Sequence, residues 1–160
     1  MNKNKIFITD DKNTQDVFLD MIKKTAGAIA ETFSNDKAYT GPEPFDLKKA
    51  VKIDMLESKG IGFDAALERV KELVLPNFVR TSSTDYMAHL HSAAFLETIA
   101  AELIISVFNQ SMDSWDQSPV ATEIEVQTVM QLCRIFGFDE NSDGVFTSGG
   151  SQSNTTGIFL

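Results

Sequence analysis

A glycine- and hydroxyl-rich segment near the end of the chain has the composition of a phosphate-binding turn. Residues 147–154 read Thr-Ser-Gly-Gly-Ser-Gln-Ser-Asn and lie between a predicted short strand and a predicted helix. The adjacent glycines Gly149 and Gly150 allow the backbone to approach a ligand closely. The helix start offers free N–H groups and positive potential, and Ser151 and Ser153 add hydroxyl donors. The segment therefore predicts a phosphate cradle, although an ordinary turn between a strand and a helix can have the same composition.

The segment differs from the common nucleotide and calcium motifs. No Gly-Lys-Ser/Thr follows the glycines, which excludes a Walker loop, and the third glycine of the dinucleotide fingerprint is absent. The acidic turn at 139–144 imitates the start of a calcium loop, but position twelve of that loop is Gly150 instead of glutamate. The sequence therefore predicts neither a nucleotide site of these classes nor a calcium site.

The two histidines, His89 and His91, stand two residues apart in a polar segment at 77–92. In an extended backbone the two side chains would point the same way. We expect no metal site, because no carboxylate or cysteine is adjacent to the pair. Two interpretations stay open: the imidazoles line a pocket that binds or protonates a substrate, or they make structural hydrogen bonds.

The composition of the 160-residue chain is that of one ordinary globular domain, with 42% hydrophobic and 23% charged residues. The net charge of −9 argues against nucleic acid and anionic membrane surfaces as partners. The longest apolar stretch, residues 92–108, is interrupted by Glu97 and Glu102 and is shorter than the roughly 20 residues of a membrane span. A single cysteine, Cys133, makes no internal disulfide, and we expect it to fill the core. We expect a cytoplasmic protein.

Helices must position these segments. Apolar residues at three- and four-residue steps predict helices at 14–33, 63–73, 93–108 and 118–136. Residues 45–58 are expected to be extended and then to form a short helix, and residues 145–147 to form a short strand. The fourth helix begins either at Ser118-Pro119 or, as a capping box with Glu125 indicates, at Thr122.

Two helices carry more apolar surface than a chain of this length can bury. The predicted helix at 93–108 is apolar on nearly every side, which is typical of a large core or a subunit interface. The final residues, Gly-Ile-Phe-Leu at 157–160, lie in a predicted helix without a terminating signal. We therefore expect a longer polypeptide, with an apolar tail docked in the core as the alternative.

Three stretches in register resemble one family. They are Tyr-Met-Ala-His-Leu-His-Ser at 86–92, Asn-Gln-Ser-Met-Asp-Ser-Trp-Asp-Gln-Ser-Pro at 109–119 with Thr-Glu-x-Glu at 122–125, and the glycine segment at 147–154. In this order and spacing they resemble the N-terminal part of the group II pyridoxal-phosphate-dependent amino-acid decarboxylases, and most of all the diaminobutyrate branch. The resemblance covers residues 77–160 well and the first 75 residues only by helical character.

The resemblance implies an α/β fold of the fold type I pyridoxal-phosphate transferase class. The present stretch would be mostly α-helical, with the first short strand of the large domain. Residues 1–76 would form a helical arm that wraps a second subunit, and residues 77–160 would begin the cofactor-binding domain. The whole enzyme would be a homodimer with shared active sites.

The resemblance also assigns roles to residues of this sequence. The phosphate of pyridoxal 5′-phosphate would be held by Gly149, Gly150 and Ser151. The substrate pocket would be lined by His89, His91 and Ser92. The loop at 109–119 would border the site, often that of the partner subunit. No metal is implied.

The implied activity is decarboxylation of L-2,4-diaminobutyrate to 1,3-diaminopropane and CO2. The family places the lysine that binds the cofactor as a Schiff base well after the phosphate motif, and no lysine follows Lys71 here. The catalytic lysine is therefore expected beyond Leu160, and this chain is not expected to be active alone. Two other classes stay open: a small helical interaction domain, and a module that binds a phosphate ligand without catalysis.

Overall fold

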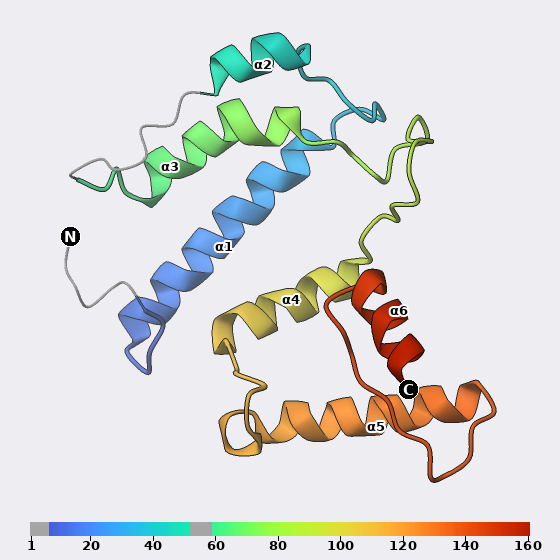
Figure 1. The fold of residues 1–160 in the computed structure, drawn as a ribbon. Coiled ribbons are helices and arrows are strands. Elements are labelled where there is room, and N and C mark those ends of the chain that lie inside the picture. The colour runs from blue at the N-terminus through green and yellow to red at the C-terminus, as the bar shows by residue number, and fades with distance from the viewer. Residues whose placement is uncertain (1–6, 52–58) are drawn as a thin grey trace. The chain divides into compact units, whose positions relative to one another are not determined.

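The computed structural model describes residues 7–51 and 59–160, and it divides into two compact units, Met1–Phe95 and Leu96–Leu160. Both units are built from helices and connecting loops (Figure 1). The first unit contains α1 (Lys12–Thr32), α2 (Pro44–Ala50), α3 (Phe63–Arg69), the π-helical η2 (Val70–Val74) and the 3-10 turn η3 (Leu75–Asn77). The second contains α4 (Leu96–Phe108), the 3-10 turn η4 (Trp115–Gln117), α5 (Pro119–Ile135) and α6 (Gly150–Phe159). The predicted boundary after residue 76 concerns the domains of a whole family member and stays a prediction.

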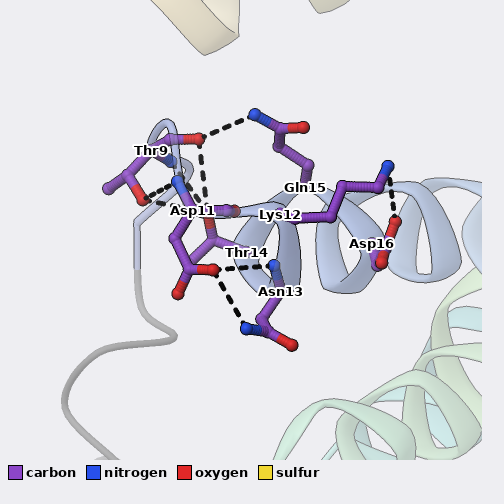
Figure 2. A network of polar contacts seen from close by, with 7 residues as sticks. All are labelled: Thr9, Asp11, Lys12, Asn13, Thr14, Gln15 and Asp16. Atoms are coloured by element: carbon purple, nitrogen blue, oxygen red, sulfur yellow. Dashed lines mark hydrogen bonds and ion pairs between the residues drawn. The ribbon is translucent and has the colours of Figure 1, made fainter.

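A polar network begins α1 (Figure 2). The Asp11 carboxylate accepts the backbone N–H of Asn13 at 2.9 Å, so Asp11 caps the helix. The Thr14 hydroxyl donates to the Asp11 carbonyl at 2.8 Å and lies 3.0 Å from the Thr9 hydroxyl. Because Thr14 is buried, these bonds satisfy a group that water does not reach. The predicted helix at 14–33 is confirmed, with a start two residues earlier.

One lysine connects two helices of the first unit. The ammonium group of Lys24 on α1 lies 2.8 Å from the Asp20 carboxylate and 2.9 Å from that of Asp64, in the first turn of α3. The helix predicted at 63–73 is confirmed, since α3 continues directly into η2, and the chain leaves helical geometry after the turn that contains Pro76.

The expectation that residues 45–58 begin with an extended segment is wrong, because residues 45–50 are helical. The helix α2 begins at Pro44, because proline at the first turn gives up no intrahelical hydrogen bond, and the backbone is extended only at its C-cap, Val51. Residues 52–58 lie outside the described part of the chain.

The ends of α5 follow from proline and glycine. Pro119 stands in the first turn, and the Thr122 hydroxyl donates to the carbonyl of Ser118 at 2.8 Å. The alternative start at Thr122 is therefore wrong. At the other end Gly137 has a φ of 81°, and its N–H donates to the carbonyl of Arg134 at 3.0 Å. Glycine adopts this left-handed conformation without strain, so the predicted end of the helix at residue 136 is confirmed to within one residue.

The predicted strand at residues 145–147 does not form. A strand needs a hydrogen-bonded neighbour, and the described segments supply none. Instead, the segment before the cradle packs against the side of α5. Val145 and Phe146 border a small apolar hollow with Val129 and Cys133, and the half-buried Cys133 thiol lies 3.9 Å from the carbonyl of Asp143.

The helix α4 presents apolar side chains at its surface. Six large apolar side chains of this helix are exposed in the structure: Leu96, Ile99, Leu103, Ile104, Ile105 and Phe108. The expected burial in a core is therefore not found within the described residues. The alternative, an interface with a partner or with further chain, stays a prediction. Among the described helices none is long and apolar enough to cross a membrane.

Candidate cofactor cradle and substrate loop

The cradle is the turn that leads into α6. Gly149 is the N-cap, with φ 155° and ψ 173°, a backbone region that is open almost only to glycine. The Thr147 hydroxyl lies 2.5 Å from the Ser153 hydroxyl and donates to the carbonyl of Gly149 at 3.2 Å. These bonds hold the segment before the glycines against the first turn of the helix.

Two further side chains, which the sequence motif did not single out, brace this turn. The carboxamide oxygen of Gln152 accepts hydrogen bonds from the backbone N–H of Ser148 and from its hydroxyl. This is a displaced version of the capping box, in which a residue in the first turn reaches back to the chain before the helix. The signal was present in the sequence, since Ser148 and Gln152 stand four residues apart across the glycines.

The cradle fits an anionic phosphate. Gly149 makes no side-chain cap with the first-turn N–H groups of α6, and no acidic residue stands in that turn. The Ser151 carbonyl accepts the Thr155 hydroxyl at 2.9 Å, whereas the Ser151 hydroxyl has no hydrogen-bond partner among the described residues. A Cβ atom at Gly150 would meet nothing within 4 Å. Open space, unpaired donors and the helix dipole together favour a phosphate group. Gly149, Gly150 and Ser151 therefore have the geometry to hold the phosphate of pyridoxal 5′-phosphate.

The histidine loop at 86–92 is not a strand. His89 has a φ of 72°, so the backbone is not extended at this position, and the premise for His89 and His91 pointing the same way is not met. The His91 ring instead makes an edge-on contact with Tyr86, with ring centroids 6.3 Å apart and planes inclined at 68°. His89, His91 and Ser92 are all exposed, and their role as substrate contacts stays a prediction.

The loop at 109–119 forms a short polar turn. The indole N–H of Trp115 donates to the Glu123 carboxylate at 3.0 Å, and the Ser114 hydroxyl donates to that of Asp116 at 2.6 Å. The first bond attaches η4 to the first turns of α5, and the second lies within η4 and its N-cap. The Ser118 side chain at the junction is fully buried, and its hydroxyl has no partner among the described residues.

The two candidate sites lie in different units of the structure. The loop with His89, His91 and Ser92 belongs to the first unit, and the turn with Gly149, Gly150 and Ser151 belongs to the second. Within the described ranges no group of three or more histidine, cysteine, aspartate or glutamate side chains is arranged to hold a metal.

Comparison with known proteins identifies the class. Residues 50–159 match the pyridoxal-dependent decarboxylase conserved domain, so this chain belongs to the pyridoxal-dependent decarboxylase family. The resemblance based on the three motifs is thereby confirmed, and the expected cofactor is confirmed as that of the family.

Individual relatives support the same family assignment. The chain is 38% identical over 133 residues to L-2,4-diaminobutyrate decarboxylase of Acinetobacter baumannii, which covers 83% of this chain and 26% of that protein. It is 34% identical over 141 residues to the enzyme of the same name from Rhizobium meliloti, covering 88% of this chain and 28% of that protein. The chain thus spans about a quarter of the length of these curated relatives.

The fold is shared with solved structures. The glutamate decarboxylase domain of diaminobutyrate-pyruvate transaminase and L-2,4-diaminobutyrate decarboxylase from Vibrio parahaemolyticus superposes with a TM-score of 0.90 at 36% identity. The match covers 97% of this chain and 34% of that one. The Oryza sativa TDC crystallised with PLP, at 19% identity and a TM-score of 0.67, shares the fold. The expected fold class is confirmed, apart from the short strand.

Proposed function

We propose that this chain supplies the phosphate cradle and the substrate loop of a pyridoxal-phosphate-dependent carboxy-lyase. The reaction is the conversion of L-2,4-diaminobutyrate to 1,3-diaminopropane and CO2. The observation that carries the proposal is the turn at Gly149–Ser151. It combines a glycine-only backbone, an unpaired hydroxyl and an uncapped helix start within a pyridoxal-dependent decarboxylase sequence. The names of the relatives from Acinetobacter baumannii and Rhizobium meliloti support the choice of substrate.

The residues of this chain have binding roles in the proposal. The first-turn N–H groups of α6 and the Ser151 hydroxyl bind the cofactor phosphate, and Gly149 permits the turn that exposes them. His89, His91 and Ser92 contact the amino acid. Bound pyridoxal phosphate supplies the electron sink that makes loss of CO2 possible. The resemblance places the lysine that anchors the cofactor well after the phosphate motif, where this sequence has none, so the proposal assigns it to a part of the enzyme outside these 160 residues.

The proposal extends to assembly and location. The exposed apolar side chains of α4, among them Ile104 at 61% and Phe108 at 68% exposure, favour burial against a second subunit or against further chain of the same polypeptide. The proposal takes the first case, a homodimer with shared active sites, and it includes a cytoplasmic location.

A direct assay tests the proposal. The native polypeptide that carries this sequence is purified, and CO2 release from carboxyl-labelled L-2,4-diaminobutyrate is measured with and without added pyridoxal phosphate. We expect release that depends on the cofactor and is faster than with aspartate, glutamate or an aromatic amino acid. The 160-residue chain alone serves as the matched control and should release none. Cofactor-dependent release from a different amino acid would overturn the substrate, and no release from any amino acid would overturn the activity.

The alternative of a binding module makes a different prediction. The absence of lysine after Lys71 is the observation that favours a binding module. If the native polypeptide is such a module, it binds pyridoxal phosphate reversibly, dialysis removes the cofactor completely, and no amino acid is decarboxylated.

A further inference from the structure

The base of the histidine loop is attached to a segment almost fifty residues earlier in the chain. One carboxylate oxygen of Asp36 accepts the Thr84 hydroxyl at 2.6 Å, and the other accepts the backbone N–H of Thr84 at 3.4 Å. The backbone carbonyl of Asp36 accepts a short hydrogen bond from the Ser83 hydroxyl. Asp36 therefore receives donors from two consecutive residues at the start of the loop. We call this set, Asp36 with Ser83 and Thr84, the Asp36 clamp.

Neighbouring contacts reinforce the same junction. The Arg80 guanidinium donates to the Asn35 carbonyl at 2.8 Å and to its side-chain oxygen at 3.1 Å, and it lies 5.7 Å from the centre of the Phe33 ring. The backbone N–H of Arg80 donates to the carbonyl of Ala38 at 2.8 Å. The polar contacts at the junction therefore join residues 35–38 to residues 80–84.

A continuous series of contacts leads from the clamp to the histidine loop. Ser83 is buried, and its hydroxyl also accepts the backbone N–H of Asp85 at 3.1 Å. The backbone N–H of Tyr86 donates to the Ser83 carbonyl at 3.1 Å, and the Tyr86 ring contacts the ring of His91. Displacement of Ser83 would therefore displace Tyr86 and with it the imidazole of His91.

The position of these contacts in the chain indicates that they order the histidine loop in addition to stabilising the fold. Closing a connection of more than forty residues costs conformational entropy, which the contacts made at its ends must offset. Exposed loop residues with few partners are mobile, whereas a ligand-binding loop must be preorganised to bind without a further ordering cost. The contacts join the chain immediately before residues 86–92, where preorganisation would have this effect.

We propose that Asp36 is a positioning residue for the substrate loop: its hydrogen bonds to Ser83 and Thr84 set the orientation of Tyr86 and His91. This inference rests on the proposed function, because it takes the amino-acid substrate as the ligand of that loop. Asp36 itself touches no substrate.

The test uses Asp36→Ala, Asp36→Asn, Thr84→Val and Ser83→Ala in the native polypeptide loaded with pyridoxal phosphate. The Asp36 variants remove or change the bonds to Thr84, and Ser83→Ala removes the bond to the Asp36 carbonyl, which the Asp36 variants keep. Hydrogen exchange of residues 83–91 is measured together with KM and kcat for L-2,4-diaminobutyrate. In Asp36→Ala we expect faster exchange in this loop and a KM raised about tenfold, as the loss of a hydrogen bond to a charged group implies. The cofactor dissociation constant should stay within about twofold of wild type, since the cradle lies in another segment.

Three variants make the result specific. Asp36→Asn keeps a side-chain acceptor for Thr84 and should recover most of the wild-type KM. Thr84→Val removes a hydroxyl from an exposed residue and keeps the proposal testable if Asp36→Ala fails to fold. Asp16→Ala is the matched control, because it removes an exposed carboxylate that, within the described ranges, pairs only with Lys12 on α1.

The outcomes separate this inference from the proposed function. A wild-type polypeptide that decarboxylates no amino acid overturns the proposed function and the substrate role of the clamp together. An active wild type, with unchanged loop exchange or unchanged KM in folded Asp36→Ala and Thr84→Val, overturns the positioning role alone. Equal losses of cofactor and substrate affinity would also overturn it, because they would indicate a general structural role.

Discussion

The side-chain oxygen of Gln152 accepts two hydrogen bonds from one residue, at 2.9 Å from the backbone nitrogen of Ser148 and at 2.7 Å from its hydroxyl oxygen. Gln152 stands in the first turn of α6 and Ser148 stands before the glycines. The pair therefore spans the cradle and leaves the N–H groups between them available. The pair orders the turn by using the two donors of Ser148, while the first-turn N–H groups of α6 and the Ser151 hydroxyl stay available to a phosphate.

Two substitutions of Gln152 should distinguish the effect of its hydrogen bonds on cofactor affinity from the effect of a negative charge at the same position. Gln152→Ala loses both bonds, and we expect cofactor affinity to fall about fivefold, since a typical hydrogen bond contributes about 1 kcal/mol. Gln152→Glu keeps the acceptor and favours the helix dipole, yet it places a negative charge beside the phosphate. Cofactor titration should therefore rank wild type above Gln152→Ala and Gln152→Ala above Gln152→Glu. Wild-type affinity in Gln152→Glu would contradict a phosphate at this turn.

The two glycines should respond differently to alanine. Gly149 has a φ of 155°, and Gly149→Ala should lower the free energy of unfolding by about 1–3 kcal/mol through backbone strain. Gly150 has helical geometry and open space at its Cβ position, so Gly150→Ala should not lower it. The added methyl group should nevertheless reduce cofactor affinity, because it occupies the space of the phosphate. Urea unfolding and cofactor titration of the same two variants measure both effects, and unimpaired binding by Gly150→Ala would count against the cradle.

The hydroxyl of Ser151 should contribute directly to cofactor binding. Ser151→Ala removes a hydrogen bond to a charged group, which is worth about 1.5–3 kcal/mol, so affinity should fall roughly 10- to 100-fold. Ser142→Ala is the matched control, because its hydroxyl bonds to Asp139 at 3.3 Å outside the cradle. An equal effect of the two substitutions would refute a specific phosphate contact by Ser151.

Replacement of His89 should impair substrate use more than cofactor retention. His89 has a φ of 72°, and asparagine tolerates this left-handed conformation better than most residues. His89→Asn therefore removes the imidazole with little change in backbone preference, whereas His89→Ala adds strain. Steady-state kinetics should show reduced kcat/KM in both variants, with cofactor content close to that of wild type. If both quantities fall equally, or neither falls, His89 has no role in substrate binding.

Lys24 should stabilise the first unit over a wide pH range. Its hydrogen bonds to Asp20 and then to Asp64 raise the pKa of Lys24 well above its ordinary value of 10.5. The folded state then holds the proton more tightly than the unfolded state, so the contribution is present below pH 10.5 and is lost as the pH rises further. The difference in unfolding free energy between wild type and Lys24→Met should therefore be constant at about pH 7 to 9 and shrink in stronger alkali. Urea unfolding at these pH values checks this, and high salt should also shrink the difference, because the groups are exposed.

Structural features that depend only on neighbouring residues could be predicted from the sequence. Pro119 and Gly137 bound α5 because proline lacks an N–H and glycine accepts a positive φ, and neither effect needs a distant partner. The same reasoning located the cradle, since Gly149 and Gly150 determine what the backbone can do between Ser148 and the helix. Three motifs in one order then identified the family.

Features that depend on distant or missing partners could not be read in this way. Residues 145–147 have strand-like composition, yet a strand exists only where a second segment completes its hydrogen bonds. The left-handed backbone of His89 and the bonds of Asp36 to Ser83 and Thr84 leave no periodic pattern. Residue type and spacing therefore specified which groups are present and where the helices begin and end. The arrangement of the histidine loop also depends on the bonds between Asp36 and residues 83–84, which are more than forty residues apart in the sequence. Only the folded chain brings such residues together.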